Sequence, residues 1–374
     1  MINRKPNRTE TRDEDYYLAS QWQLVWRKFR RHKLALFATA IVLLLYFMAI
    51  FAEFFSVNDY QQRFASAASS PPTAIHFFDE AGQFYLRPFV YQMEQTLDMD
   101  TLQRVYTEDT SMRYPLKLFV QGSDYEVWGL FAGNLRILGV DEPATLFLFG
   151  TDEFGRDVYS RTIHASRISL SIGFIGVMMS FVLGCIIGGI SGYFGGTTDL
   201  VIQRIIEFVI SIPTIPLWIA LAAALPPQWT SVQVYFGITI VLATVGWTTL
   251  ARTVRGKLLE LREADFVMAA RISNMSDFDI ILKHLLPSFA SYLIVTLTLA
   301  VPGMILGETA LSFLEIGIRP PAVSWGVLMQ DAQNVRALSQ SPWLLIPAAF
   351  VIVTVLCFNF IGDGLRDAAD PYKQ

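Results

Sequence analysis

The chain has 374 residues, of which 53% are hydrophobic and only 17% charged, with a formal net charge of -4. A soluble domain of this size would carry more charge, and the mean hydropathy of +0.39 points the same way. Basic residues flank apolar runs instead of forming a groove-binding face, so we expect no nucleic-acid partner. Composition therefore predicts an all-α polytopic membrane protein.

Six segments are predicted to cross the membrane, because uncharged runs of about 20 residues are long enough for a bilayer-spanning helix. The first segment is 34–56, with its uncharged run at 34–52. The others are 168–194, a third and a fourth around 208–251 separated by Pro226-Pro227, 285–307, and a sixth within 337–362. Pro213 and Pro216 are expected to kink the third.

Residues 1–33 are interpreted as a cytoplasmic tail followed by an interfacial helix. Aromatic residues at 16–18 and 22–26 precede a basic cluster formed by Arg27, Lys28, Arg30, Arg31 and Lys33. Basic residues beside a span favour the cytoplasmic side, so the N-terminus is predicted there. Six crossings then return the C-terminus to the cytoplasm.

Residues 57–147 are predicted to form a small extracytoplasmic α+β insertion. We expect a hairpin at 77–86, a helix at 93–106, and a second hairpin with strands at 116–120 and 125–130 around a turn at 121–124. The insertion is expected to act as a cap over the spans, as a docking surface for a soluble partner, or as both.

A polar loop at 256–287 separates the fourth and fifth spans. Its surroundings are basic, which again favours the cytoplasm: Arg252, Arg255, Lys257, Arg262, Arg271 and Lys283. The small side chains of Ala269 and Ala270 would let another protein approach the backbone closely. The loop is therefore a candidate docking element.

Enzyme signatures are not found in the sequence. The pairs Gly188-Gly189 and Gly195-Gly196 lack the lysine of a phosphate-binding loop, so we expect helix packing and a turn there. The two cysteines, Cys185 and Cys357, lie in apolar runs and are expected to be buried thiols. We expect no catalytic site, no metal and no cofactor.

The segment from 148 to 161, LFGTDEFGRDVYSR, is followed by ASRISL at 165–170. It resembles the signature before the second span in ABC-importer permeases of the peptide/nickel class. Further similarities are GYFGG at 192–196, SWG at 324–326 and NFIGDGLRDA at 359–368, which fit the C-type subunit. The resemblance covers 22–56 and 148–374. Its outer-face signature residues are Gly150, Thr151, Asp152, Gly155, Arg156, Asp157 and Arg167, which we expect to brace the span entry more than to bind substrate.

The loop at 256–287 is similar to the coupling loop of the same family, which sits on the ATPase. Ala269, Ala270, Leu286 and Pro287 match at the expected spacing, whereas Met268 and Asn274 replace the family's Glu and Gly. The candidate coupling residues are Phe266, Met268, Ala269, Ala270, Ser273, Asn274, Asp277 and Pro287.

The resemblance implies the type I permease fold and one half of a translocation pore in an ATP-driven, binding-protein-dependent importer of the bacterial inner membrane. Implied partners are a second homologous permease, two ATP-binding subunits, an extracytoplasmic solute-binding protein and membrane lipid. The expected solute is a peptide, although nickel, oligosaccharide and opine importers share this class. Two other functions stay open: a secondary transporter and a membrane-anchored receptor. Glu207, Glu308 and Glu315 lie near span ends, so we expect hydrated or paired carboxylates.

Overall fold

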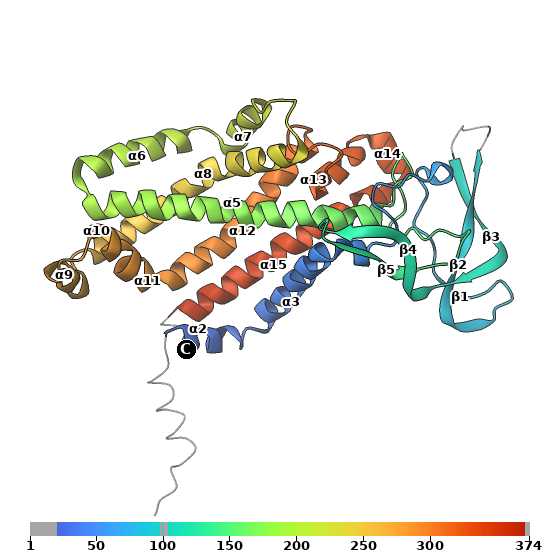
Figure 1. The fold of residues 1–374 in the computed structure, drawn as a ribbon, viewed down its shortest axis with the longest axis horizontal. Helices are drawn as coiled ribbons and strands as arrows, with labels where there is room; N and C mark the ends of the chain where they lie inside the picture. Colours follow the sequence, from blue (N-terminus) through green and yellow to red (C-terminus); the bar gives the residue numbers. More distant parts are fainter. Residues whose placement is uncertain (1–20, 98, 100–103, 371–374) are drawn as a thin grey trace, which may run out of the picture.

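The computed structural model describes residues 21–97, 99 and 104–370, and it consists of a helical bundle with a small β-rich unit at one end (Figure 1). Five helices are long and apolar enough to cross a membrane. They are α3 (Lys33–Ile50), α5 (Val158–Phe194), α8 (Ser231–Leu261), α12 (Ala290–Phe313) and α15 (Ile346–Ala369). These helices confirm the all-α membrane fold class.

The third predicted span is broken. Helices α6 (Gly196–Ser211) and α7 (Thr214–Ala223) meet at an angle of 86°, so the bundle has six spans if this pair counts as one. Pro213 lies at the break, as predicted. The prediction for Pro216 was wrong, because it lies in the first turn of α7, where a missing backbone N–H leaves no helical hydrogen bond unmade.

Short helices connect the spans. They are α2 (Gln21–Phe29), α4 (Ala52–Phe55), α9 (Asp265–Ile272), α10 (Asp277–Asp279), α11 (Leu286–Ser288), α13 (Trp325–Leu328) and α14 (Val335–Gln340). Of the predicted interfacial helix, residues 22–26 lie in α2, whereas residues 16–18 fall outside the described part of the chain.

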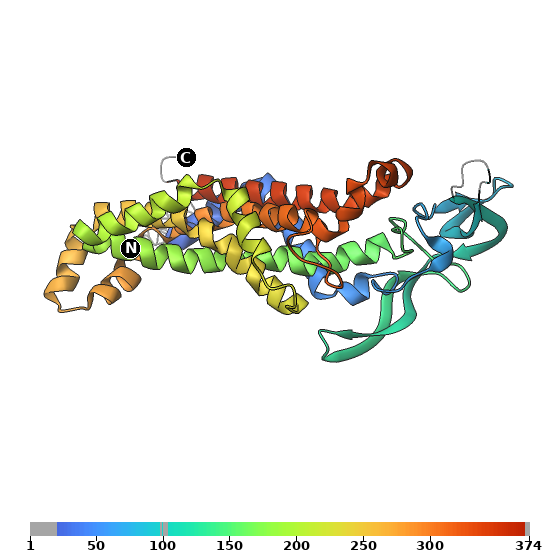
Figure 2. The same ribbon diagram turned by 90° about the horizontal axis from the view of Figure 1, so that it is seen from above.

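Two ends of the bundle are distinct in Figure 1. The β-rich unit lies at one, called here the insertion end, and α9 protrudes at the other, called the α9 end. The Nζ of Lys28 in α2 donates to the backbone oxygen of Asp370 at 3.0 Å, so the first described helix and the last described residue lie near each other. Figures 1 and 2 show both away from the insertion end.

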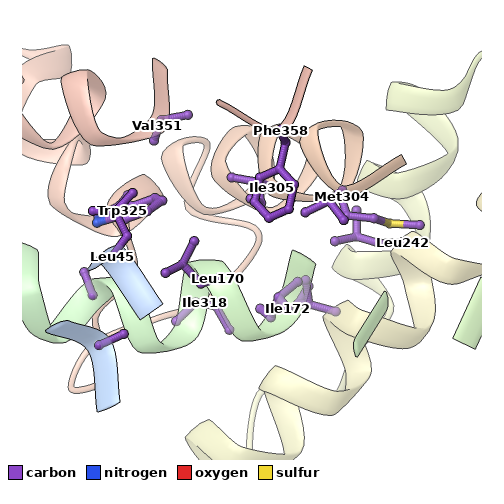
Figure 3. Close-up of a cluster of buried hydrophobic side chains, with 14 of the residues drawn as sticks. Leu45, Leu170, Ile172, Leu242, Met304, Ile305, Ile318, Trp325, Val351 and Phe358 are labelled. Carbon is purple, nitrogen blue, oxygen red and sulfur yellow. The ribbon is translucent and has the colours of Figure 1, made fainter. Parts of the chain in front are cut away.

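The main hydrophobic core contains buried side chains from all five spanning helices, and Figure 3 shows part of it. Leu170 and Ile172 of α5 meet Ile305 of α12, and Trp325 of α13 is fully buried beside them. The Trp325 indole N–H donates to the backbone oxygen of Thr162 at 3.2 Å, so its polar edge is satisfied inside this core.

Helices α5 and α8 approach each other closely because glycines recur at every fourth position of α5. A Cβ on Gly188 would collide with the Ala251 carbonyl, and a Cβ on Gly192 would lie 2.7 Å from the Arg255 carbonyl oxygen. Small residues at this spacing are typical of tight packing between membrane helices. The predicted packing role of Gly188 is therefore confirmed.

The insertion is built from strands. Strands β1 (His76–Phe78), β2 (Phe84–Leu97) and β3 (Arg104–Pro115) form an antiparallel sheet in that order, while β4 (Lys117–Val127) pairs with β5 (Phe131–Gly139) in a separate antiparallel hairpin. Between residues 57 and 147, the only helix in the described part is the 3-10 turn Ala65–Ala67.

Two predictions for the insertion were therefore wrong. The helix expected at 93–106 is the outer half of the β2–β3 hairpin, so the insertion is a β unit and not an α+β one. The turn expected at 121–124 lies inside β4, and the chain reverses instead at 128–130. The hairpin expected at 77–86 is confirmed by the pairing of β1 with β2.

Candidate functional site

The first candidate site is the signature turn, residues 150–157, at the start of α5. Asp152 is 1% exposed, and its carboxylate accepts from the backbone N–H groups of Phe154 and Arg156, each at 2.9 Å. The Nε of Arg156 approaches it at 2.7 Å, and the buried guanidinium of Arg161 also pairs with it. One carboxylate thus closes the turn and joins it to α5.

Asp157 fixes the beginning of α5. Its side chain accepts from the backbone N–H groups of Tyr159 and Ser160 and is the N-cap of the helix. The Nδ2 of Asn58 donates to the same carboxylate at 3.2 Å. Burial raises the pKa of Asp157 to about 6, although these hydrogen bonds act in the opposite direction.

Thr151 and the two glycines attach the turn to the segment after the first span. Thr151 makes two hydrogen bonds with Ser70 of this segment: its N–H donates to the Ser70 oxygen at 2.9 Å, and its side-chain hydroxyl accepts from the Ser70 N–H at 2.8 Å. Gly155 has a φ of +71° and lies against the Phe64 backbone, where a Cβ would collide. Gly150 has a similar left-handed φ and the same Ser70 oxygen as a neighbour.

Arg167 is the one signature residue that lies apart from this turn. Its guanidinium donates to both carboxylate oxygens of Glu53 at 2.6 and 2.5 Å. It also donates to the carbonyl oxygens of Ala49 and Ile50, at 2.6 and 2.8 Å. Arg167 therefore caps the end of α3 and ties it to α5, which is a structural role.

The second candidate site is α9 and the segment that follows it. Helix α9 ends in a Schellman motif: the Met275 N–H donates to the Ala270 oxygen at 3.2 Å, and the Asn274 N–H donates to the Arg271 oxygen at 3.0 Å. Asn274 has a φ of +56°. Asparagine tolerates this left-handed conformation better than other non-glycine residues, which explains how it can occupy the family's glycine position.

Tyr193, at the end of α5, holds this segment in place. Its hydroxyl donates to Asp277 at 2.6 Å and accepts from the Nε of Arg271 at 3.3 Å, and the Arg271 guanidinium lies 5.1 Å from its ring centre. The tyrosine thereby links the last turn of α9 to the start of α10. This role could not be anticipated from the sequence, because Tyr193 is far from both helices along the chain.

The two alanines of α9 differ in exposure. Ala270 is 6% exposed and packs with Val267 in a cluster that includes Leu258 and Leu285, whereas Ala269 is exposed. The prediction that both would face a partner protein was therefore wrong for Ala270. The outward face of α9 is formed by Phe266, Met268, Ala269, Ile272 and Ser273, and we call this set the α9 face.

A π-helical turn, η2 (Ile280–Leu285), leads from α10 into Pro287 and α11. The N–H of Leu286 donates to the Ile281 oxygen, which is five residues back. The wider turn fits Pro287 because a proline has no N–H to donate and would clash in a regular helix. Among the described residues, no group of three or more His, Cys, Asp or Glu could hold a metal ion.

A bundle of five or six candidate spans places the chain in the class of multi-pass membrane proteins. The sequence profile described as "Binding-protein-dependent transport system inner membrane component" matches residues 180–373. The chain belongs to this family, and it is a permease subunit of the inner membrane without an ATPase domain of its own. A second profile, described as the N-terminal TM domain of oligopeptide transport permease C, matches residues 20–72.

Curated relatives agree with this assignment. The oligopeptide transport system permease protein OppC of Haemophilus influenzae is 44% identical over 60% of this chain and 70% of its own length. The dipeptide transport system permease protein DppC of Bacillus subtilis is 40% identical over 61% and 70%. OppC of Bacillus subtilis is 30% identical over 94% of this chain and 90% of its own, so this similarity includes the insertion region.

Proposed function

We propose that this chain forms one half of the translocation pore of an importer for oligopeptides or dipeptides. The proposed solute rests on the relatives, which are named as oligopeptide and dipeptide permeases. A second homologous permease would supply the other half of the pore. Membership of the family supports this function over a secondary transporter or a membrane-anchored receptor.

The proposed orientation puts the α9 end in the cytoplasm and the insertion end outside. Basic residues support it, since Arg27, Lys28, Arg30, Arg31 and Lys33 surround the start of α3 at the end opposite to the insertion. Both termini would then be cytoplasmic, and the insertion would face the solute-binding protein.

The observation that carries the proposed coupling role is the α9 face. Ile272 is 85% exposed and Met268 is 47% exposed on a helix that protrudes from the bundle, while the opposite side of α9 is fixed by Val267, Ala270 and Tyr193. A rigid helix with an apolar outer face is suited to bind an ATP-binding subunit and to transmit its movement to the bundle.

The test is uptake by the assembled importer. This chain would be co-expressed with the candidate second permease and ATP-binding subunits, purified as a complex, and reconstituted into vesicles with the solute-binding protein outside. We expect ATP-dependent accumulation of a labelled tripeptide, with no accumulation when ATP is replaced by a non-hydrolysable analogue. Uptake driven by an ion gradient without ATP would overturn the proposal, and ATP-dependent uptake of nickel but of no peptide would reject the solute.

A further inference from the structure

The β4–β5 hairpin carries an apolar tip that is largely exposed among the residues that the structure describes. Leu130 is 76% exposed and Phe131 is 69% exposed, and Trp128 beside them is 59% exposed. These three residues, called here the hairpin tip, would be an unfavourable surface in water. In Figure 2 the hairpin projects to one side of the bundle instead of folding onto it.

Direct contacts fix the level of this tip relative to the first span. The indole N–H of Trp128 donates to the backbone oxygen of Ile50, the last residue of α3, at 3.1 Å. The guanidinium of Arg167, which caps the same end of α3, lies 4.5 Å from the centre of the Trp128 ring. The tip therefore lies where a membrane-spanning helix ends, which is the level of the lipid headgroups.

A series of aromatic rings also runs from the base of the same hairpin onto the exposed surface of α3. Phe119 of β4 lies 6.3 Å from Phe54, which contacts Phe55 at 5.3 Å, and Phe55 in turn lies 5.6 Å from Phe47 of α3 (ring centres). Phe47 is half-exposed on α3, whose exposed face also carries Phe37 and the aliphatic residues Leu43 and Leu44. Trp and other aromatic residues concentrate at membrane–water interfaces, because an amphipathic ring is best solvated there.

The turn at the hairpin tip has backbone φ angles that are unfavourable for its residues. Trp128 has a φ of +55°, and Gly129 after it has a φ of +67°, in a turn closed by the Leu130 N–H to the Val127 oxygen at 3.0 Å. Hairpin turns of this hand usually contain Asn-Gly or Asp-Gly, because a bulky residue is strained in the left-handed conformation. Strain of this kind at an exposed position is associated with function.

We propose that the hairpin tip inserts into the lipid headgroup region at the insertion end, so that the insertion is attached to the bilayer surface as well as to the bundle. The occupant of this surface is lipid, because the tip is apolar, carries no charge of its own and continues the apolar surface of a membrane-spanning helix. Insertion is shallow, since the exposed acidic residues Asp124 and Glu126 lie only a few positions from the tip.

Environment-sensitive fluorescence tests this in the assembled importer. Cys185 and Cys357 would be replaced by alanine, and single cysteines at Leu130→Cys or Leu86→Cys would carry a nitrobenzoxadiazole label in phosphatidylcholine nanodiscs. Leu86 is a matched control, because it is 88% exposed but lies in the other sheet, on β2. We expect a blue-shifted emission at position 130 that is quenched by lipids brominated near the headgroup end of the acyl chains, and neither effect at position 86.

Two results would overturn the proposal. Water-like emission at position 130 would mean that the tip is free in solution. A blue shift without quenching by brominated lipid would mean that protein covers the tip, and the second permease would then be its partner. Asp124→Cys provides a depth reference, since its label should remain water-like if the insertion is shallow.

Discussion

Asp152 is the residue on which the signature turn depends most. It satisfies two backbone N–H groups and two arginines while almost fully buried. We expect Asp152→Asn to leave the guanidinium of Arg161 buried without its countercharge, at a cost of about 3–5 kcal/mol. The measurement is thermal unfolding of the purified subunit, with Glu153→Gln as control, because Glu153 is adjacent but exposed. An equal midpoint for both variants would contradict this role of the turn.

Asp331, in the 3-10 helix Gln330–Gln333 between α13 and α14, is expected to make the stability of its surroundings depend on pH. Burial, together with the negative charge of Asp152, raises its pKa to about 6, although Arg161 and Arg156 act against this shift and Glu153 adds to it. A raised pKa means that the folded state binds the proton more tightly than the unfolded one. The ionised Asp331 carboxylate therefore destabilises the folded state. This destabilisation is absent below about pH 4, where the carboxyl is protonated in both the folded and the unfolded state, and it is complete above about pH 6.

Asp331→Asn removes this penalty. We expect the variant to be more stable than the wild type by at most about 3 kcal/mol at pH 8, with a smaller gain at pH 5, since one pKa unit corresponds to 1.36 kcal/mol. The measurement is the difference in unfolding midpoint between the two proteins at both pH values. A difference that is independent of pH would show that the pKa of Asp331 is not raised.

At the scale of elements, α9 offers a paired experiment. Ala269→Arg puts a long charged side chain on the α9 face, whereas Ala270→Arg forces it into the cluster with Val267. We expect Ala269→Arg to leave folding intact and to reduce solute-stimulated ATP hydrolysis at least about tenfold, because a buried unpaired charge at an interface costs several kcal/mol. Ala270→Arg should instead lower the unfolding midpoint of the subunit alone. Normal coupling in Ala269→Arg would contradict the assignment of α9.

The apolar runs predicted five of the six spans as single helices, because a membrane helix needs length and little charge, and both are visible in one sequence. The remaining predicted span is the bent pair α6 and α7. The secondary structure of the insertion was harder to predict. Residues 93–97 of β2 are mostly exposed on both faces, so they show no alternation, and their Met, Glu, Gln and Leu favour a helix locally. Pairing with β3 decides the conformation, and this partner lies across a loop that local propensity does not reveal.

The misplaced turn in β4 has a specific cause. Gly122, Ser123 and Asp124 have turn composition, but here they form an irregularity in the pairing between Gln121 and Tyr125. The reason is Arg136, which is 5% exposed, reaches past Gly122 and donates to the Ser123 hydroxyl at 2.7 Å and the Asn58 oxygen at 3.1 Å. Arg136, fourteen positions after Gly122, thus occupies the space that a side chain at Gly122 would fill. At α9, similarly, the motif identified the segment but not which alanine points outward.

At the scale of the whole molecule, we expect the binding functions of the two ends of the bundle to be independent of each other. We expect removal of the three-stranded sheet, residues 76–115, with a short Gly-Ser linker, to weaken capture of the solute-binding protein. Assembly with the ATP-binding subunits should be unchanged, because α9 lies at the opposite end (Figure 1). The measurement is a pull-down of both partners on intact and shortened complexes. Equal capture of the solute-binding protein would leave the sheet with the role of a structural cap.

Helix α5 connects the two candidate sites physically. Its 37 residues begin at the Asp157 cap in the signature turn and end beside Tyr193, which holds α9. The glycine-mediated packing against α8 stiffens it along its second half. Such a helix is about 55 Å long, and a tilt of about 5° around its midpoint displaces each end by about 2 Å. Movement of α9 would therefore reach the base of the insertion through α5, because α5 would tilt in the membrane as one continuous rod. No series of side-chain rearrangements would be needed.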